Sequence, residues 1–176
     1  MQKTINRRAI LFLAQAAAVA ALYAGLTYAV APLSYGALQF RVSEILCILP
    51  VLSPAAIPGL FVGCILANFG SPLGLMDVVC GSAATLLAAL LTYAVRKMNV
   101  KGIPLLAPLP PVLLNGAVIG LELACLGAGD VFAVGNFTWS AYAAAGLSVA
   151  FGELVVCYAG GLPLWMLARK VLRLRD

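Results

Sequence analysis

The sequence predicts an all-α integral membrane protein with six transmembrane helices and both termini in the cytoplasm. The 176-residue chain is 64% hydrophobic and 10% charged, with a mean hydropathy of +1.06, whereas a soluble domain carries about 25% charged residues. Long apolar runs alternate with short stretches rich in proline, glycine and polar residues, and most cations stand in three groups beside the runs. We expect a single membrane domain covering residues 1–176.

The first apolar run covers about residues 9–31 and follows a basic start at 1–8. A signal peptide is the alternative, because Ala29-Val30-Ala31 resembles a cleavage site. The apolar core of a signal peptide has about 7–15 residues, which this run exceeds, and Pro32 follows it directly. We therefore expect a first membrane helix.

Alanines recur at four-residue spacing along this helix, in Ala14/Ala18, Ala17/Ala21 and Ala20/Ala24. Residues four apart share one helix face, so these pairs form stripes of small side chains where another helix can approach closely. Packing within the chain and docking of a partner protein both account for such stripes, and the sequence leaves that choice open.

The later helices are expected at about residues 38–52, 55–68, 73–95, 104–125 and 139–168. Turn residues separate them, at Ser53-Pro54 and Ser71-Pro72 among others. Gly59 and Gly63 have the spacing of a close-packing face. The prolines Pro108, Pro110 and Pro111 predict an irregular or kinked start of the fifth helix, and Pro163 predicts a bend or break in the sixth.

The cations support six spans. An even number puts both termini on one side, and a cytoplasmic location for them also places the basic loop around residues 96–101 inside. All of the eleven Lys and Arg residues except Arg41 are then cytoplasmic. Five or seven spans would move a basic group outside. The outer connections are then about 32–38, 69–72 and 127–138.

Four acids fall within the expected membrane segments: Glu44, Asp77, Glu122 and Glu153. An ionisable group at the centre of a membrane helix costs about 2.5–3.5 kcal/mol on insertion scales, so such groups usually serve a function. In the six-span topology these acids converge on the outer half of the protein. Asn115 precedes Glu122 by seven residues on the same helix face. We expect an acid-rich cavity open to the outside, with Asn115 deeper in it.

Each of these residues also has a purely structural interpretation. Arg41 and Glu44, three residues apart, could pair with each other, and Arg41 could snorkel to the interface. Asp77 could cap its helix. Glu122 and Glu153 could form hydrogen bonds between helices.

Two aromatic residues near the outer end of the sixth helix, Trp139 and Tyr142, either belong to the aromatic belt or stack on a flat ligand. The cysteines are interpreted as small buried hydrophobes, since they lack Cys-x-x-Cys spacing and the chain has no His to complete a metal set; they are Cys47, Cys64, Cys80, Cys125 and Cys157. We expect no metal or cofactor and no nucleic-acid partner.

The residues alone thus predict a six-helix membrane protein whose pocket suits a cation or a planar molecule with several donors. The chain has no Walker motif and no nucleophile–base pair, so we expect no intrinsic catalysis. A protein that captures a solute but cannot drive its movement should take energy from a partner.

Several segments in order along the chain resemble the QueT family: Gln39-Phe-Arg-Val-Ser-Glu44, Pro54-Ala-Ala-Ile-Pro-Gly-Leu-Phe-Val-Gly63, Leu109-Pro-Pro-Val-Leu-Leu-Asn-Gly116 with Gly120-Leu-Glu122, and Gly152-Glu-Leu-Val-Val-Cys-Tyr158. This resemblance implies a substrate-binding S component of an energy-coupling factor (ECF) transporter for queuosine precursors. It further implies the six-helix S-component fold in the bacterial cytoplasmic membrane, a pocket closed by outer loops, and toppling within a complex of a transmembrane T component and two ATPase subunits. The alanine stripe on the first helix, Ala14, Ala17, Ala18 and Ala21, is then expected to dock the T component.

The implied substrate is a 7-deazaguanine, such as the 7-aminomethyl base or a queuine-like base. Its N1–H and N2–H₂ donors suit one carboxylate and its ammonium group suits a second, for which we expect Glu122 and Glu153. Asn115 would hydrogen-bond to the remaining edge of the base, and Glu44 is the alternative acid. Arg41 would either orient Glu44 or face the C6 carbonyl. The alternatives are an S component for riboflavin, thiamin or folate, and a membrane assembly subunit without a ligand.

Overall fold

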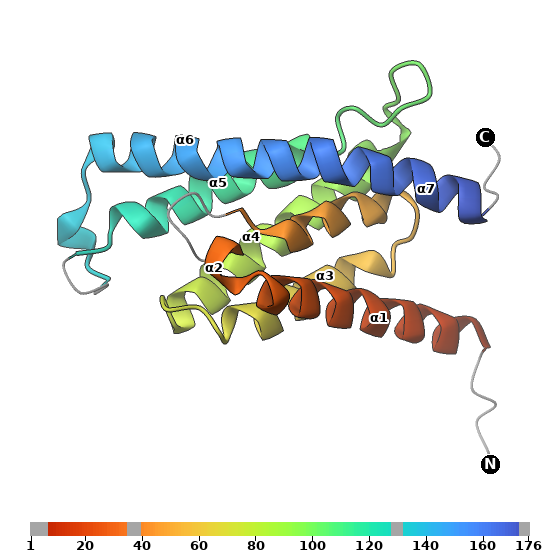
Figure 1. Ribbon diagram of the computed structural model, residues 1–176, viewed down its shortest axis with the longest axis horizontal. Coiled ribbons are helices and arrows are strands. Elements are labelled where there is room, and N and C mark those ends of the chain that lie inside the picture. Colours follow the sequence, from red (N-terminus) through yellow and green to blue (C-terminus); the bar gives the residue numbers. More distant parts are fainter. Residues whose placement is uncertain (1–6, 35–39, 128–131, 173–176) are drawn as a thin grey trace, which may run out of the picture.

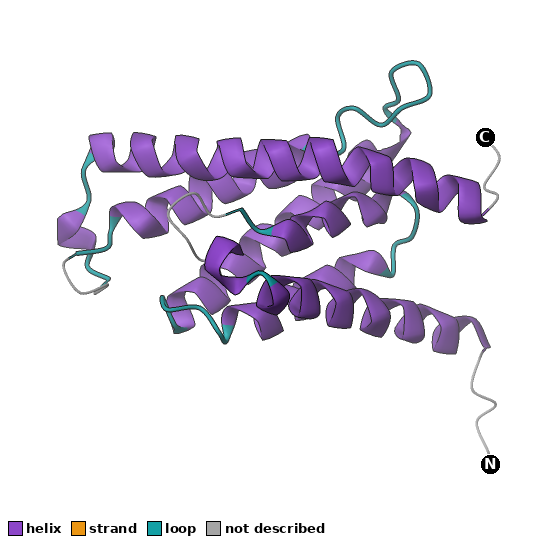
Figure 2. Cartoon of the chain, viewed as in Figure 1, coloured by secondary structure: helices purple, strands orange, loops and turns teal. Residues whose placement is uncertain are grey.

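The computed structural model describes residues 7–34, 40–127 and 132–172. These residues form α1 (Arg7–Ala29), α2 (Ala31–Ser34), η1 (Val42–Val51), α3 (Ala56–Asn68), α4 (Leu75–Ala94), η2 (Val95–Lys97), α5 (Leu109–Ala124), η3 (Val134–Asn136), α6 (Trp139–Val156), the π-helical η4 (Cys157–Gly161) and α7 (Leu162–Leu172). Figure 2 shows helices joined by loops, and no strand is present within the described ranges. The all-α prediction is confirmed for this part of the chain.

Six helical segments run back and forth along one axis: α1, η1, α3, α4, α5 and the continuous α6–η4–α7 (Figure 1). The start of α1 and the end of α7 lie at the same end of the bundle, as six antiparallel segments require. The connection between η2 and α5 lies at this end as well. The described residues of the three basic groups therefore lie at one end of the bundle: Arg7, Arg8, Arg96, Lys97, Lys101, Arg169 and Lys170.

Three of the segments are long and apolar enough to cross a membrane, namely Arg7–Ala29, Leu75–Lys97 and Trp139–Val171. The other three, η1, α3 and α5, are shorter apolar helices. The 13 residues of α3 extend about 20 Å at 1.5 Å per residue, less than the roughly 30 Å of a bilayer core. The shorter helices pack against the longer ones, and turns and loops continue the chain beyond their ends.

Proline placement explains where the helix boundaries differ from expectation. The fifth helix begins at Leu109 instead of 104, with Pro110 and Pro111 in its first turn, where the missing N–H groups need no partner. The π-helical segment Cys157–Gly161 comes just before Pro163, so the sixth helix is irregular there, but it continues without a break into α7. The expected start of the second helix near 38 lies outside the described residues.

The second segment itself is a 3-10 helix with Pro50 inside it, and it begins at Val42. Arg41 therefore stands just before this helix with an extended backbone, not within its first turn. The η1 segment is central, because it contacts α1, α3, α4, α6, η4 and α7. Side chains at its start thus face several helices at once.

Glycines on α3 bring α1 close. A Cβ atom added to Gly63 would lie 2.8 Å from Tyr23 Cβ and 2.9 Å from the Ala20 carbonyl oxygen, and one on Gly59 would lie 2.7 Å from the Ala16 carbonyl oxygen. The predicted close-packing face is confirmed. The small residues of α1 therefore lie on two faces of the helix, one buried and one exposed. Ala20 and Ala24 are buried with Tyr23 in the protein, whereas the remaining stripe is exposed: Ala14, Ala17, Ala18 and Ala21.

Candidate functional site

The predicted site residues other than Trp139 are all buried. Their exposed fractions are 5% for Arg41, 1% for Glu44, 2% for Asp77, 3% for Asn115, 2% for Glu122 and 4% for Glu153. They come from the segment before η1, from η1 and from α4, α5 and α6. Buried ionisable groups are usually paired, hydrogen-bonded or engaged with a ligand. The contacts of each group therefore decide which one is left for a ligand.

Glu44 is held by neutral donors. The Tyr23 hydroxyl on α1 donates to Oε1 of Glu44, and the Cys47 thiol donates to Oε2 at 2.7 Å. Tyr23 is fully buried against α3, so the position of this donor depends on the α1–α3 contact. Both oxygens of Glu44 thus have a protein partner.

Glu153 is held in the same way between α5 and α6. The Asn115 amide donates to Oε1 of Glu153 at 2.9 Å, and the Cys157 thiol donates to Oε2 at 3.5 Å. The structure brings Asn115 and Glu153 together from positions 38 residues apart.

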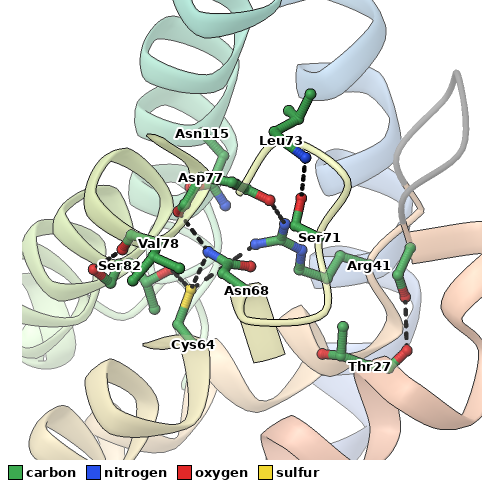
Figure 3. Close-up of polar contacts among 12 residues, drawn as sticks. Thr27, Arg41, Cys64, Asn68, Ser71, Leu73, Asp77, Val78, Ser82 and Asn115 are labelled. Atoms are coloured by element: carbon green, nitrogen blue, oxygen red, sulfur yellow. Dashed lines mark hydrogen bonds and ion pairs between the residues drawn. The ribbon is translucent and has the colours of Figure 1, made fainter. Parts of the chain in front are cut away.

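Arg41 pairs with Asp77. Its Nη2 lies 3.6 Å from Oδ2 of Asp77, and its Nη1 lies 3.9 Å from the sulfur of Cys64 (Figure 3). Asp77 stands in the first turn of α4, where the helix dipole favours a carboxylate. The Arg41–Glu44 ion pair considered from the sequence is not formed.

Two residues that sequence reasoning did not select, Asn68 and Thr85, complete this network, and Tyr23 beside Glu44 was also missed. The Asn68 amide nitrogen donates to the backbone carbonyl of Asp77 at 2.7 Å and lies 3.5 Å from the Cys64 sulfur (Figure 3). The Thr85 hydroxyl also donates to that sulfur, at 3.3 Å. The available signals were a lone Asn ending an apolar helix and a Tyr within the alanine-rich first helix. Four cysteines are buried as expected, whereas Cys80 is only half-buried, which corrects the prediction for that residue. Cys47, Cys64 and Cys157 also make polar contacts.

A group of buried acceptors in this cluster has no hydrogen-bond partner among the described residues. It consists of both carboxylate oxygens of Glu122, Oδ1 of Asp77 and Oδ1 of Asn68. Glu122 lies on the same face of α5 as Asn115, and α5 packs against α4, which carries Asp77. Buried polar groups in native proteins are nearly always hydrogen-bonded. The cluster therefore matches a ligand that brings several hydrogen-bond donors.

The charges of the buried side chains also favour a ligand with donors, and in particular a cation. The cluster contains four carboxyl groups, of Glu44, Asp77, Glu122 and Glu153, and one guanidinium group, of Arg41. Uncompensated carboxylates in a low-dielectric site attract a cation strongly. Among these acids Glu122 has the fewest partners, so it is the one best placed to receive positive charge.

Trp139 lies apart from the buried cluster. It is 76% exposed at the first residue of α6, whereas Glu153 comes 14 residues later, about 21 Å along the helix. Its ring contacts Phe137 edge-on at a centroid distance of 5.2 Å and Tyr142 at 6.1 Å. With Tyr142 and Gly146 it lines an apolar groove between α5 and α6. This position suits the aromatic belt, and its contact with a ligand stays a prediction.

A family model described as QueT transporter matches residues 13–170 of the chain. The match begins within α1 and ends within α7, so every residue named in the buried cluster lies inside it. Neither a curated protein nor a solved structure matches the chain.

Proposed function

Because the chain belongs to the QueT transporter family, we propose that it is the substrate-binding S component of an ECF-type importer for a queuosine precursor. In this role it captures 7-aminomethyl-7-deazaguanine or a queuine-like base outside the cell. An ATP-driven module then delivers the base inward. The family and the long apolar helices make the protein a membrane transport protein. The substrate and the coupling to ECF partners are the proposal.

The observation that carries the proposal is the Glu122 carboxylate, which is 2% exposed and has no hydrogen-bond partner on either oxygen among the described residues. A 7-aminomethyl-7-deazaguanine offers a guanine edge with N–H donors and an ammonium group. A carboxylate accepts strong, charge-assisted hydrogen bonds from such groups. Binding would satisfy acceptors that are otherwise costly to bury.

Glu153 is the second acid proposed to bind the base. Its oxygens already accept hydrogen bonds from Asn115 and Cys157, but each carboxylate oxygen has a further lone pair for a ligand donor. Glu44, held by Tyr23 and Cys47, is the third acid of the proposed site.

The proposed partners are supported by the outer surface of α1 and by the basic residues. The exposed alanines of α1 leave a smooth stripe along the membrane face, which suits close approach of the T component; they are Ala14, Ala17, Ala18 and Ala21. The end of the bundle with the basic groups would face the cytoplasm, where the two ATPase subunits operate.

Thermal unfolding of the purified protein tests the substrate. The ligands are aminomethyl and cyano deazaguanines, queuine, guanine, riboflavin, thiamin and folate. A ligand at 100 times its Kd adds about 2.7 kcal/mol to the free energy of unfolding, which raises the Tm of a chain of this size by about 5–11 °C. We expect such a rise with the deazaguanines.

Two variants sharpen this experiment. Glu122→Gln keeps the side-chain shape and removes the charge, and it should abolish most of the rise in Tm. The exposed-surface variant Met98→Ala, at a residue outside the proposed site, should keep the rise. A rise with a vitamin alone would overturn the substrate. No rise with any compound would contradict ligand capture and favour the ligand-free assembly subunit.

A further inference from the structure

Asn68 presents an acceptor whose orientation is fixed by its neighbours. Its amide nitrogen lies 2.7 Å from the backbone carbonyl of Asp77, and a carbonyl oxygen can only accept a hydrogen bond. The nitrogen must therefore be on that side, which assigns the other side of the amide to Oδ1. That oxygen is buried and has no partner among the described residues.

Asp77 presents a second acceptor beside it. Its Oδ2 faces Arg41 at 3.6 Å, while Oδ1 has no hydrogen-bond partner among the described residues. A Cβ atom added to Gly81 would lie 2.5 Å from the Asn68 amide nitrogen and 3.0 Å from Oδ1 of Asp77. Both side chains therefore converge on the same part of α4, where the absence of a side chain on Gly81 leaves room for them.

Arg41 supplies donors next to these acceptors. A guanidinium group has several N–H donors in a planar fork, and the contacts of Arg41 among the described residues are with Asp77 and the Cys64 sulfur. Arg41 contacts Asp77, and Asp77 contacts Asn68. Taken in this order, the three residues present a donor, an acceptor and an acceptor. We refer to these three residues as the edge-reading row.

We propose that the edge-reading row binds the edge of a 2-amino-4-oxo pyrimidine ring, as found in guanine and 7-deazaguanine. This edge presents a carbonyl acceptor, a ring N–H and an exocyclic NH₂ in a line, which complements the row. Arg41 donates to the carbonyl, Oδ1 of Asp77 accepts from the ring N–H, and Oδ1 of Asn68 accepts from the amino group. The inference rests on the proposed function and specifies which side chains recognise the base.

Glu122 is then left for the ammonium group. The Arg41–Asp77 pair has no net charge, so the row suits a neutral base edge. The carboxylate of Glu122 has neither an ion pair nor a hydrogen bond among the described residues, and a carboxylate without a cation is the stronger site for an ammonium group. The row and Glu122 thus contact different parts of one ligand.

Equilibrium binding to the purified full-length protein tests the assignment with three ligands. They are 7-aminomethyl-7-deazaguanine, its analogue without the 2-amino group, and 7-methyl-7-deazaguanine, which lacks the ammonium group. On the wild-type protein, loss of the 2-amino group should weaken binding roughly 10- to 100-fold, because a buried acceptor is left unpaired. This comparison of ligands uses only the wild-type protein, so it does not depend on whether a variant folds.

The variants locate each contact. Asn68→Ala should bind the ligands with and without the 2-amino group about equally. Glu122→Gln should still bind the ligand with the 2-amino group more tightly than the one without it. It should lose the preference for the aminomethyl ligand over the methyl ligand. The control is Ser82→Ala on α4, whose hydroxyl bonds to the Val78 carbonyl within the helix. Ser82→Ala should discriminate as the wild type does.

Three results would overturn the assignment. The first is that the wild-type protein binds a deazaguanine without discriminating against the analogue that lacks the 2-amino group. The second is that Asn68→Ala weakens binding of both ligands by the same factor. The third is that Glu122→Gln abolishes the 2-amino discrimination. In each case the row does not read the edge, although the proposed substrate stands. Failure of the wild-type protein to bind any deazaguanine contradicts the substrate and the row together.

Discussion

The contact between α1 and α3 should control the binding site, and Gly63→Ala is the perturbation that tests this. The added Cβ atom would lie 2.8 Å from Tyr23 Cβ, 2.9 Å from the Ala20 carbonyl oxygen and 3.0 Å from Ala20 Cα. Two of these atoms belong to the backbone, so no side-chain rotation relieves the overlap. The helices must separate, which moves the Tyr23 hydroxyl away from Glu44.

Gly25→Ala on α1 is the matched control, because no atom lies within 4 Å of the added Cβ atom. Both substitutions gain the same helix propensity, about 1 kcal/mol, so this term cancels between them. The remaining difference is the overpacking at Gly63, about 1–3 kcal/mol. For a chain of this size it corresponds to a difference in Tm of about 2–12 °C.

Thermal unfolding of both variants in detergent gives this difference directly, and ligand titration gives the effect on the site. We expect Gly63→Ala to melt below Gly25→Ala and to bind the deazaguanine more weakly. Equal melting temperatures for the two variants would refute the close packing of α1 on α3. Equal affinities in the presence of a lower Tm would refute the link from this contact to the site.

Three further predictions concern the buried charges and are measured by unfolding of the ligand-free protein. Glu122→Leu should increase the free energy of unfolding by about 1–3 kcal/mol, because it removes a buried carboxylate without a partner; a loss of stability would show that Glu122 is already satisfied. Arg41→Met should cost about 3–5 kcal/mol by leaving Asp77 without its cation, and adding Asp77→Leu should recover part of the loss; strictly additive losses would argue against the ion pair. Tyr23→Phe should cost about 1–3 kcal/mol through the lost hydrogen bond to Glu44, and an unchanged Tm would contradict that bond.

The fold class and the membership of the buried cluster could be predicted from the sequence because both follow from solvation. The apolar runs predicted the helices, and the grouping of the cations predicted that both ends of the chain lie at one end of the bundle. The cost of burying Glu44, Asp77, Glu122 and Glu153 in a membrane helix predicted that they share a site. The same reasoning selected Asn115, which the structure joins to Glu153.

The pairing within the cluster could not be predicted because it depends on how helices far apart in sequence approach each other. Sequence spacing suggested Glu44 as a partner for Arg41, but the extended backbone at Arg41 directs its side chain to α4 and Asp77. Asn68 and Tyr23 were missed for a related reason. A single polar residue in an apolar helix shows its role only when its partner on another helix is known.

The most direct test of the central claim is a structure of the protein bound to 7-aminomethyl-7-deazaguanine. We predict that the base lies within the buried cluster, with its ammonium group within hydrogen-bond distance of the Glu122 carboxylate. A base bound instead in the apolar groove beside Trp139, with Glu122 still without a partner, would contradict the claim.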